Sequence, residues 1–161
     1  MDPTLHPDVE PLACLLGTWA GIGSGEYPTI SPFDYAEEVT FTHVGKPFLA
    51  YRQATTRLDT GLPAHAEMGY FRGIGEGHVE LVLSHPTGIS ELAAGVVEPS
   101  PEGLTLLLSS THITRTHTAK DVRAVERTFI VTADTLTYTV SMAAITHPLT
   151  HHLTATLHRT A

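Results

Sequence analysis

The sequence predicts an all-β protein: an antiparallel up-and-down β-barrel of about ten strands, preceded by a short helix or turn. Three observations lead to this fold class. Short runs rich in Val, Leu, Ile, Thr, Tyr and Phe follow one another along the 161 residues. Turns that contain Gly or Pro separate these runs. Beyond the N-terminal region, the apolar residues show no sustained helical period.

The elements follow in a simple order from the N-terminus. Residues 1–10 are expected to form a loose tail, and DVEPLACLL, at 8–16, a short helix or turn. Turn signals such as Gly45-Lys46-Pro47 and Gly75-Glu76-Gly77 then separate the strand-like runs. The whole chain, 1–161, is expected to be one domain. The strand-like runs are 17–27, 36–44, 48–58, 64–74, 78–85, 89–98, 104–113, 121–132, 135–145 and 150–159.

Alternation of side chains within the runs indicates a sheet with one buried face. In HVELVLSH, the residues Val79, Leu81, Leu83 and His85 share a face, so His85 is expected to point inward. Consecutive hairpins of this kind most simply close into a calycin-like or lipocalin-like barrel, with a flattened sandwich as the competing architecture. A closed barrel of about ten strands is too wide for its own side chains to fill, which predicts a ligand cavity.

Composition excludes several classes of function. The formal net charge is −8, and nine Lys and Arg residues are too few to suggest a nucleic-acid partner. No apolar run approaches the length of a membrane span, and the N-terminus lacks the basic residues of a signal peptide. The single cysteine, Cys14, suits a reducing compartment, and a cytoplasmic location is expected. No C-x-x-C or H-E-x-x-H is present, so a zinc site lacks its usual sequence spacing.

The chain's only tryptophan lies in an unusual segment, Gly17-Thr18-Trp19-Ala20-Gly21-Ile22-Gly23, which reads G-x-W-x-G-x-G. Part of its role is architectural, because a tryptophan ring can plug a barrel end and glycines let strands bend and approach. Together with GEYPTI, which follows it, and with FDYAEEVTFTHVGKPFLAY, HAEMGYFR, VELVLSHPTGI and HPLTHHLTATLHR, this segment resembles the nitrobindin family, in order and over most of the chain. Its members are haem-binding β-barrels described as peroxynitrite isomerases.

The resemblance implies a ten-stranded barrel that binds one haem b per chain. It implies isomerisation of peroxynitrite to nitrate at ferric haem and reversible binding of nitric oxide, which together scavenge reactive nitrogen species. A homodimer is compatible with the family. The family's histidine ligand, in the pattern P-L-x-x-H-L, maps to His152, which is then both the metal ligand and the catalytic residue.

Strand alternation alone gives a different orientation for His152. Leu153, Ala155 and Leu157 form the apolar set of the last run, and His152 falls in the polar set. A simple inside-apolar rule would turn His152 outward and leave its neighbour His151 as an alternative ligand. The conflict is resolved if the strand carries a bulge at this point, or if the polar side of the strand lines the haem pocket.

Other candidate haem contacts come from the same comparison. It places His65 and His85 in the haem cavity and Met142 on its wall, although Met142 would serve equally well as core filling. Thr29 is expected to border the haem, and Lys120 to meet a haem propionate. The rival function is a carrier of a fatty acid or another small apolar ligand in the barrel cavity. A nitric-oxide sensor that signals to a partner is a third alternative.

Overall fold

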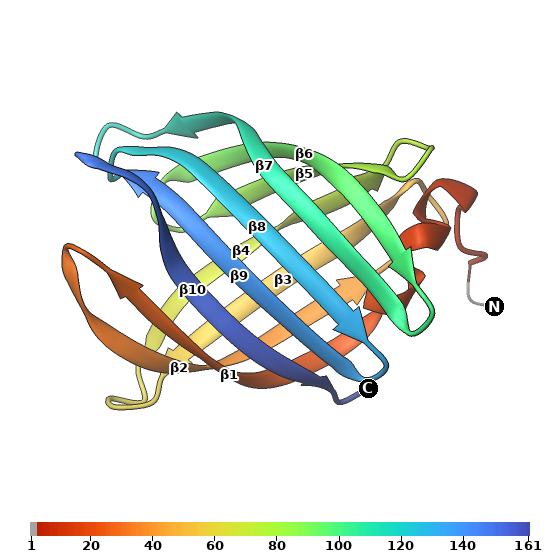
Figure 1. Cartoon of the computed structure of the whole chain (residues 1–161), viewed down its shortest axis with the longest axis horizontal. Coiled ribbons are helices and arrows are strands. Elements are labelled where there is room, and N and C mark those ends of the chain that lie inside the picture. Colours follow the sequence, from red (N-terminus) through yellow and green to blue (C-terminus); the bar gives the residue numbers. More distant parts are fainter. Residues whose placement is uncertain (1–2) are drawn as a thin grey trace.

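The computed structural model describes residues 3–161 and contains one closed β-barrel (Figure 1). All neighbouring strands are antiparallel, and the barrel closes where β1 pairs with β10. The predicted fold class, a ten-stranded antiparallel barrel with a short N-terminal helix, is confirmed. The elements are η1 Pro7–Leu15, β1 Gly17–Tyr27, β2 Ile30–Thr42, β3 Phe48–Arg57, β4 Pro63–Gly73, β5 His78–His85, β6 Ile89–Ser100, β7 Gly103–Arg115, β8 Val122–Thr132, β9 Thr135–Ala144 and β10 His147–Arg159.

The helix η1 is a 3₁₀ helix that begins earlier than the sequence suggests. Pro7 starts it, and the His6 side chain accepts a hydrogen bond from the Asp8 backbone N–H at its N-terminus. The sequence predicted a helix or turn over 8–16 that overlapped a loose tail over 1–10; Val9 is fully buried and holds the start of the helix against the barrel. Residues 1 and 2 of that tail lie outside the described residues. No helix in residues 3–161 has the length and apolar character needed to cross a membrane.

The helix η1 covers one end of the barrel, at the right of Figure 1, and Trp19 is buried in the same apolar cluster as Val9, Leu12 and Leu15 of this helix. The indole of Trp19 is completely buried and donates a hydrogen bond from Nε1 to the carbonyl of Leu15, at 2.8 Å. The Arg159 guanidinium carbon lies 4.1 Å from the centroid of the indole ring. The lone tryptophan therefore joins the helix to both the first and the last strand.

Two glycines of the G-x-W-x-G-x-G segment have a steric reason. A Cβ on Gly21 would lie 2.1 Å from the carbonyl oxygen of Thr156 on β10, so only glycine permits this close strand approach. A Cβ on Gly23 would lie 2.3 Å from the ring of Tyr35, which fills the space that glycine leaves. The segment thus closes the barrel seam and also makes room for an aromatic side chain in the interior.

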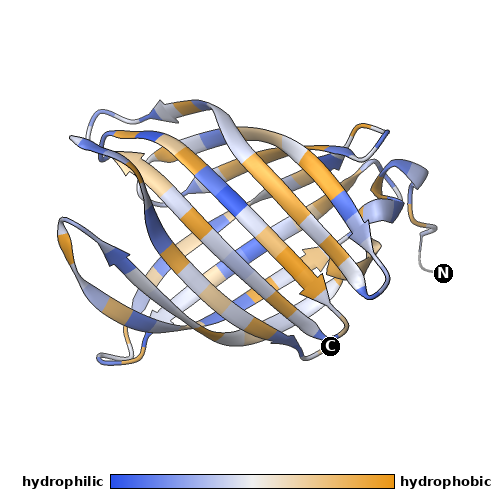
Figure 2. Ribbon diagram, in the orientation of Figure 1, coloured by the Kyte–Doolittle hydropathy of each residue, from blue (hydrophilic) through white to orange (hydrophobic). Residues whose placement is uncertain are grey.

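Side chains alternate between the interior and the outer surface along the strands, and Figure 2 shows the corresponding alternation of apolar and polar residues. In β9, Leu136, Tyr138 and Val140 point inward and are buried. In β8, Val125, Arg127 and Phe129 do the same. A charged residue therefore occupies an inward position among apolar ones, which becomes important at the cavity.

Candidate functional site

The barrel interior holds a cavity of about 240 Å³ at the end away from η1. Strand β4 fixes this placement, because Gly73 at its last position contacts η1 while His65 and Glu67 near its start line the cavity. The walls are mostly apolar, and the ionisable groups of β4, β5, β6 and β8 gather in one part of the lining. The apolar lining residues are Phe33, Ile89, Val122, Val125, Phe129, Val140, Met142 and Leu153.

A bulge in β10 brings His152 to the cavity. In the pairing with β9, His151 lies opposite Ser141 and Leu153 opposite Val140, so His152 is the extra residue. Two consecutive residues, His152 and Leu153, consequently line the cavity. The apparent conflict in the strand's alternation is resolved by this bulge. The side chain of His151 is exposed instead and lies 3.3 Å from the Thr154 hydroxyl.

The hydrogen bonding of His152 defines its tautomer. Its Nδ1 lies 2.9 Å from the carbonyl oxygen of Glu26, and because a carbonyl only accepts, Nδ1 must carry the proton. Burial lowers the pKa of His152, which favours the neutral ring. The ring also packs edge-on against Tyr27, with 5.5 Å between centroids. A neutral, fixed imidazole with an unprotonated Nε2 is the form in which histidine binds a metal.

The other predicted contact residues divide into two groups. His65, His85, Met142 and Lys120 all line the cavity. Thr29 does not: it lies exposed in the turn between β1 and β2, outside the set of lining residues. The role of each in binding a cofactor stays a prediction.

A buried ionic cluster on the cavity floor is absent from the sequence-based expectations. Arg127 donates to Glu91 from Nη1 at 2.5 Å and to Glu67 from Nη2 at 3.0 Å. All three side chains are less than a tenth exposed. Tyr51 donates to the other oxygen of Glu67 at 2.9 Å. Strand alternation could have predicted that these side chains point inward. Arg127 shares its strand face with Val125 and Phe129, and Glu91 shares its face with Ile89 and Ala93.

Charge pairing keeps this cluster ionised. Burial alone would raise the pKa of Glu67, but Arg127, His65 and His85 outweigh it and hold that pKa well below its usual range. Burial likewise opposes ionisation of Glu91, and Arg127 and His85 reverse the effect and lower its pKa. The two carboxylates in turn raise the pKa of Arg127 against the effect of burial. The cavity floor therefore carries two carboxylates against one guanidinium.

A third buried carboxyl, Glu37, has a raised pKa, whereas the pKa values of Glu67 and Glu91 are lowered. Glu37 accepts a 2.6 Å hydrogen bond from the Tyr138 hydroxyl, which lies 2.8 Å from the hydroxyl of Tyr35. Burial is the largest effect on Glu37, and the negative Glu67 adds to it, so that its pKa rises to about 7 from 4.5. The protonated form is thus the one that the fold favours.

This shift predicts a pH-dependent stability that Glu37→Gln should remove. Because the folded-state pKa is raised, the stabilisation is fully present below pH 4.5 and is lost as the pH rises through about 7. Between pH 5 and pH 8, the wild type should lose on the order of 2–3 kcal/mol of unfolding free energy relative to Glu37→Gln. Urea denaturation at both pH values measures this, with the exposed neighbour Glu38→Gln as the matched control. A parallel pH dependence in wild type and Glu37→Gln would contradict it.

Fold and cavity together define a ligand-binding β-barrel with a metal-competent histidine beside an apolar pocket. Comparison with known proteins gives the family. A family model described as the THAP4-like heme-binding beta-barrel domain matches residues 8–159. The chain belongs to this family of haem-binding barrels, and the family resemblance in the sequence is confirmed.

Named relatives and a solved structure agree with this placement. The chain is 54% identical to a protein named peroxynitrite isomerase from Nocardia farcinica, over 96% of this chain and 92% of that protein. It is 53% identical to peroxynitrite isomerase 2 from Mycobacterium avium, over 99% of both chains. The crystal structure of Rv2717c from M. tuberculosis superposes with a TM-score of 0.95 at 46% identity, covering 98% of this chain and 100% of that one.

Proposed function

We propose that this chain binds one haem b through Nε2 of His152 and isomerises peroxynitrite to nitrate. The observation that carries the proposal is His152 itself, a neutral imidazole held by Glu26 at the wall of an apolar cavity. Relatives more than half identical over nearly the full chain are named for this reaction. The same site would bind nitric oxide reversibly, so that the protein would scavenge reactive nitrogen species.

The lining residues fit a haem in three respects. Apolar side chains such as Phe33, Met142 and Leu153 offer the surface that a porphyrin face needs. His152 offers a neutral nitrogen, and its Nδ1–H to the Glu26 carbonyl is the second hydrogen bond that metal-binding histidines usually make. Lys120 supplies a cation in the lining for a propionate carboxylate.

The haem, His152, the apolar walls and the two histidines His65 and His85 each have a separate role in the proposed reaction. Haem iron, when bound, supplies the chemistry that breaks and remakes bonds in peroxynitrite. His152 holds the iron and remains neutral because its surroundings disfavour the charged ring. The apolar walls exclude water from the reacting anion. His65 and His85 place imidazole nitrogens in the cavity lining, where an N–H can hydrogen-bond to an anionic substrate.

A hemin titration followed by absorbance tests the proposal. The wild type should saturate at one haem per chain, and His152→Ala should bind hemin at least about 10–100-fold more weakly, the loss typical when a metal ligand's support is removed. His151→Ala is the matched control, because it removes the adjacent but exposed histidine. Saturated wild type should then raise the yield of nitrate from peroxynitrite. Stoichiometric haem with an unchanged spectrum in His152→Ala would overturn the assignment of the ligand.

The apolar cavity also suits the rival function, a carrier of a fatty acid or another small apolar ligand. The same titration separates the two functions. A wild type with no saturable change in the hemin spectrum, but with saturable binding of a fluorescent fatty acid, would favour the carrier.

A further inference from the structure

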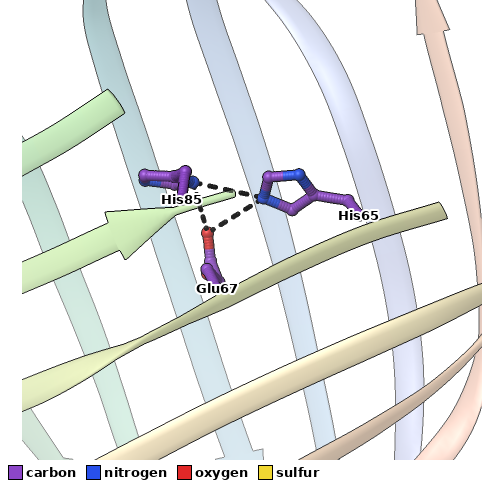
Figure 3. Close-up of side chains that lie close together, drawn as sticks. All are labelled: His65, Glu67 and His85. Carbon is purple, nitrogen blue, oxygen red and sulfur yellow. Dashed lines mark hydrogen bonds and ion pairs between the residues drawn. The ribbon is translucent and has the colours of Figure 1, made fainter. Parts of the chain in front are cut away.

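Three side chains on the polar side of the cavity converge on one point (Figure 3). His65 and Glu67 alternate on β4, and His85 ends β5, the next strand. Nε2 of His65 lies 3.2 Å from Nδ1 of His85 and 3.5 Å from Oε2 of Glu67, and Nδ1 of His85 lies 3.4 Å from the same oxygen. These donor atoms form a nearly equilateral triangle.

The size of this triangle matches a metal site. With bonds of about 2.1 Å to nitrogen or oxygen, a tetrahedral ion separates its ligand atoms by about 3.4 Å. We propose that His65, Glu67 and His85 bind a single divalent transition-metal ion of the Zn²⁺ class, separate from any metal held at His152. Two imidazoles and one carboxylate are a ligand set that zinc and ferrous iron both use with an open position.

Supporting hydrogen bonds already orient each ligand. His85 places Nε2 3.2 Å from Oε2 of Glu91, so a proton on Nε2 leaves Nδ1 free to bind a metal. Tyr51 donates to Oε1 of Glu67, which leaves Oε2 for the ion and for Arg127. The Thr55 hydroxyl lies 2.8 Å from both the backbone N and the backbone O of His65. Carboxylate–histidine pairs of this kind are the usual outer shell of metal sites.

Charge and access also favour an ion at this point. The two carboxylates of Glu67 and Glu91 outnumber the one guanidinium of Arg127 that pairs with them. The His65 side chain is about a third exposed, so an ion can enter from the cavity without passing through the core. A bound ion would keep its fourth position toward that cavity, where water or a small anion could occupy it.

No contiguous motif marks this site, because the ligands come from two strands. His65 and Glu67 form an H-x-E pair, and His85 is twenty positions further along the chain. The absence of H-E-x-x-H therefore excludes the helical zinc motif but not this arrangement on paired strands. The ligand set does not include His152, but His65 and His85 line the same cavity, so metal binding is first measured on the haem-free chain.

Titration with Co²⁺ tests the proposal, since Co²⁺ accepts zinc ligand sets and its visible absorption reports coordination geometry. The full chain, stripped of metal with a chelator, is titrated before and after hemin loading, with equilibrium dialysis for stoichiometry. One Co²⁺ per chain with an intense tetrahedral band is expected before loading, displaceable by Zn²⁺. His65→Ala should weaken binding by about 10–100-fold, and circular dichroism confirms that the variant is folded.

Two control variants make the result specific. His151→Ala and His158→Ala each remove an exposed histidine outside the triangle. Both should bind Co²⁺ as the wild type does. Failure of the wild type to give the tetrahedral band, an equal loss in His65→Ala and His151→Ala, or undiminished binding in folded His65→Ala would each overturn the proposal.

Discussion

Replacing Arg127 by methionine is expected to lower the free energy of unfolding by about 3–5 kcal/mol, the usual effect of breaking a buried ion pair from one side. Arg127 is 6% exposed and pairs with both Glu67 and Glu91. Without it, two buried carboxylates face each other across the cavity floor with no guanidinium between them. With only His65, His85 and Tyr51 beside them, they must either remain charged without their strongest partner or take up protons, and both options destabilise the fold.

A matched surface variant separates burial from charge. Arg72 pairs with Glu80 on the outer face, and its side chain is about half exposed. Arg72→Met should therefore change the unfolding free energy by less than about 1 kcal/mol. Urea denaturation at pH 7 measures both variants. Equal effects of the two substitutions would show that the buried cluster contributes no more than a surface pair.

The origin of the Arg127 effect can be checked by neutralising its partners. Adding Glu67→Gln and Glu91→Gln to Arg127→Met removes the uncompensated charges, so part of the lost stability should return. The triple variant could instead be less stable than Arg127→Met by the sum of the losses that Glu67→Gln and Glu91→Gln cause on their own. That result would show that the two carboxylates do not act through Arg127.

The barrel was predictable from the sequence because its strands obey simple local rules. Period-two alternation and turns such as Gly75-Glu76-Gly77 mark most strand ends within a few residues. Strand β2 is the exception, since the structure starts it at Ile30, whereas the sequence run begins at 36. The segment from Ile30 contains Pro32 and lies on the largely exposed hairpin with β1, where an apolar alternation is not needed.

The site was only partly predictable, because two features depend on tertiary structure. The orientation of His152 depends on a bulge that the pairing of β10 with β9 reveals, and alternation alone turned this side chain outward. The ionic cluster joins residues of β4, β6 and β8, whose contacts no local pattern contains. An inward position for Arg127 was readable from its apolar neighbours, but its partners were not.

The two ends of the barrel have separate tasks. One end is filled by η1 and Trp19, which are not among the residues that line the cavity. The other end opens on the cavity that His152 and the cluster border. Substitutions at the first end should therefore lower stability without changing ligand binding, whereas substitution of His152 at the second end should weaken ligand binding.

Trp19→Ala is the sharpest test of this division. Removing a fully buried tryptophan should lower the free energy of unfolding by about 3–5 kcal/mol. The loss combines the cavity that remains, the hydrogen bond to Leu15 and the contact with Arg159. Hemin stoichiometry, measured on the folded fraction at low temperature, should stay at the wild-type value.

His152→Ala should give the reverse pattern, with lost hemin binding and nearly unchanged unfolding of the haem-free chain. Loss of hemin binding in folded Trp19→Ala would mean that the plugged end also shapes the cavity, and that the two tasks are coupled through the barrel.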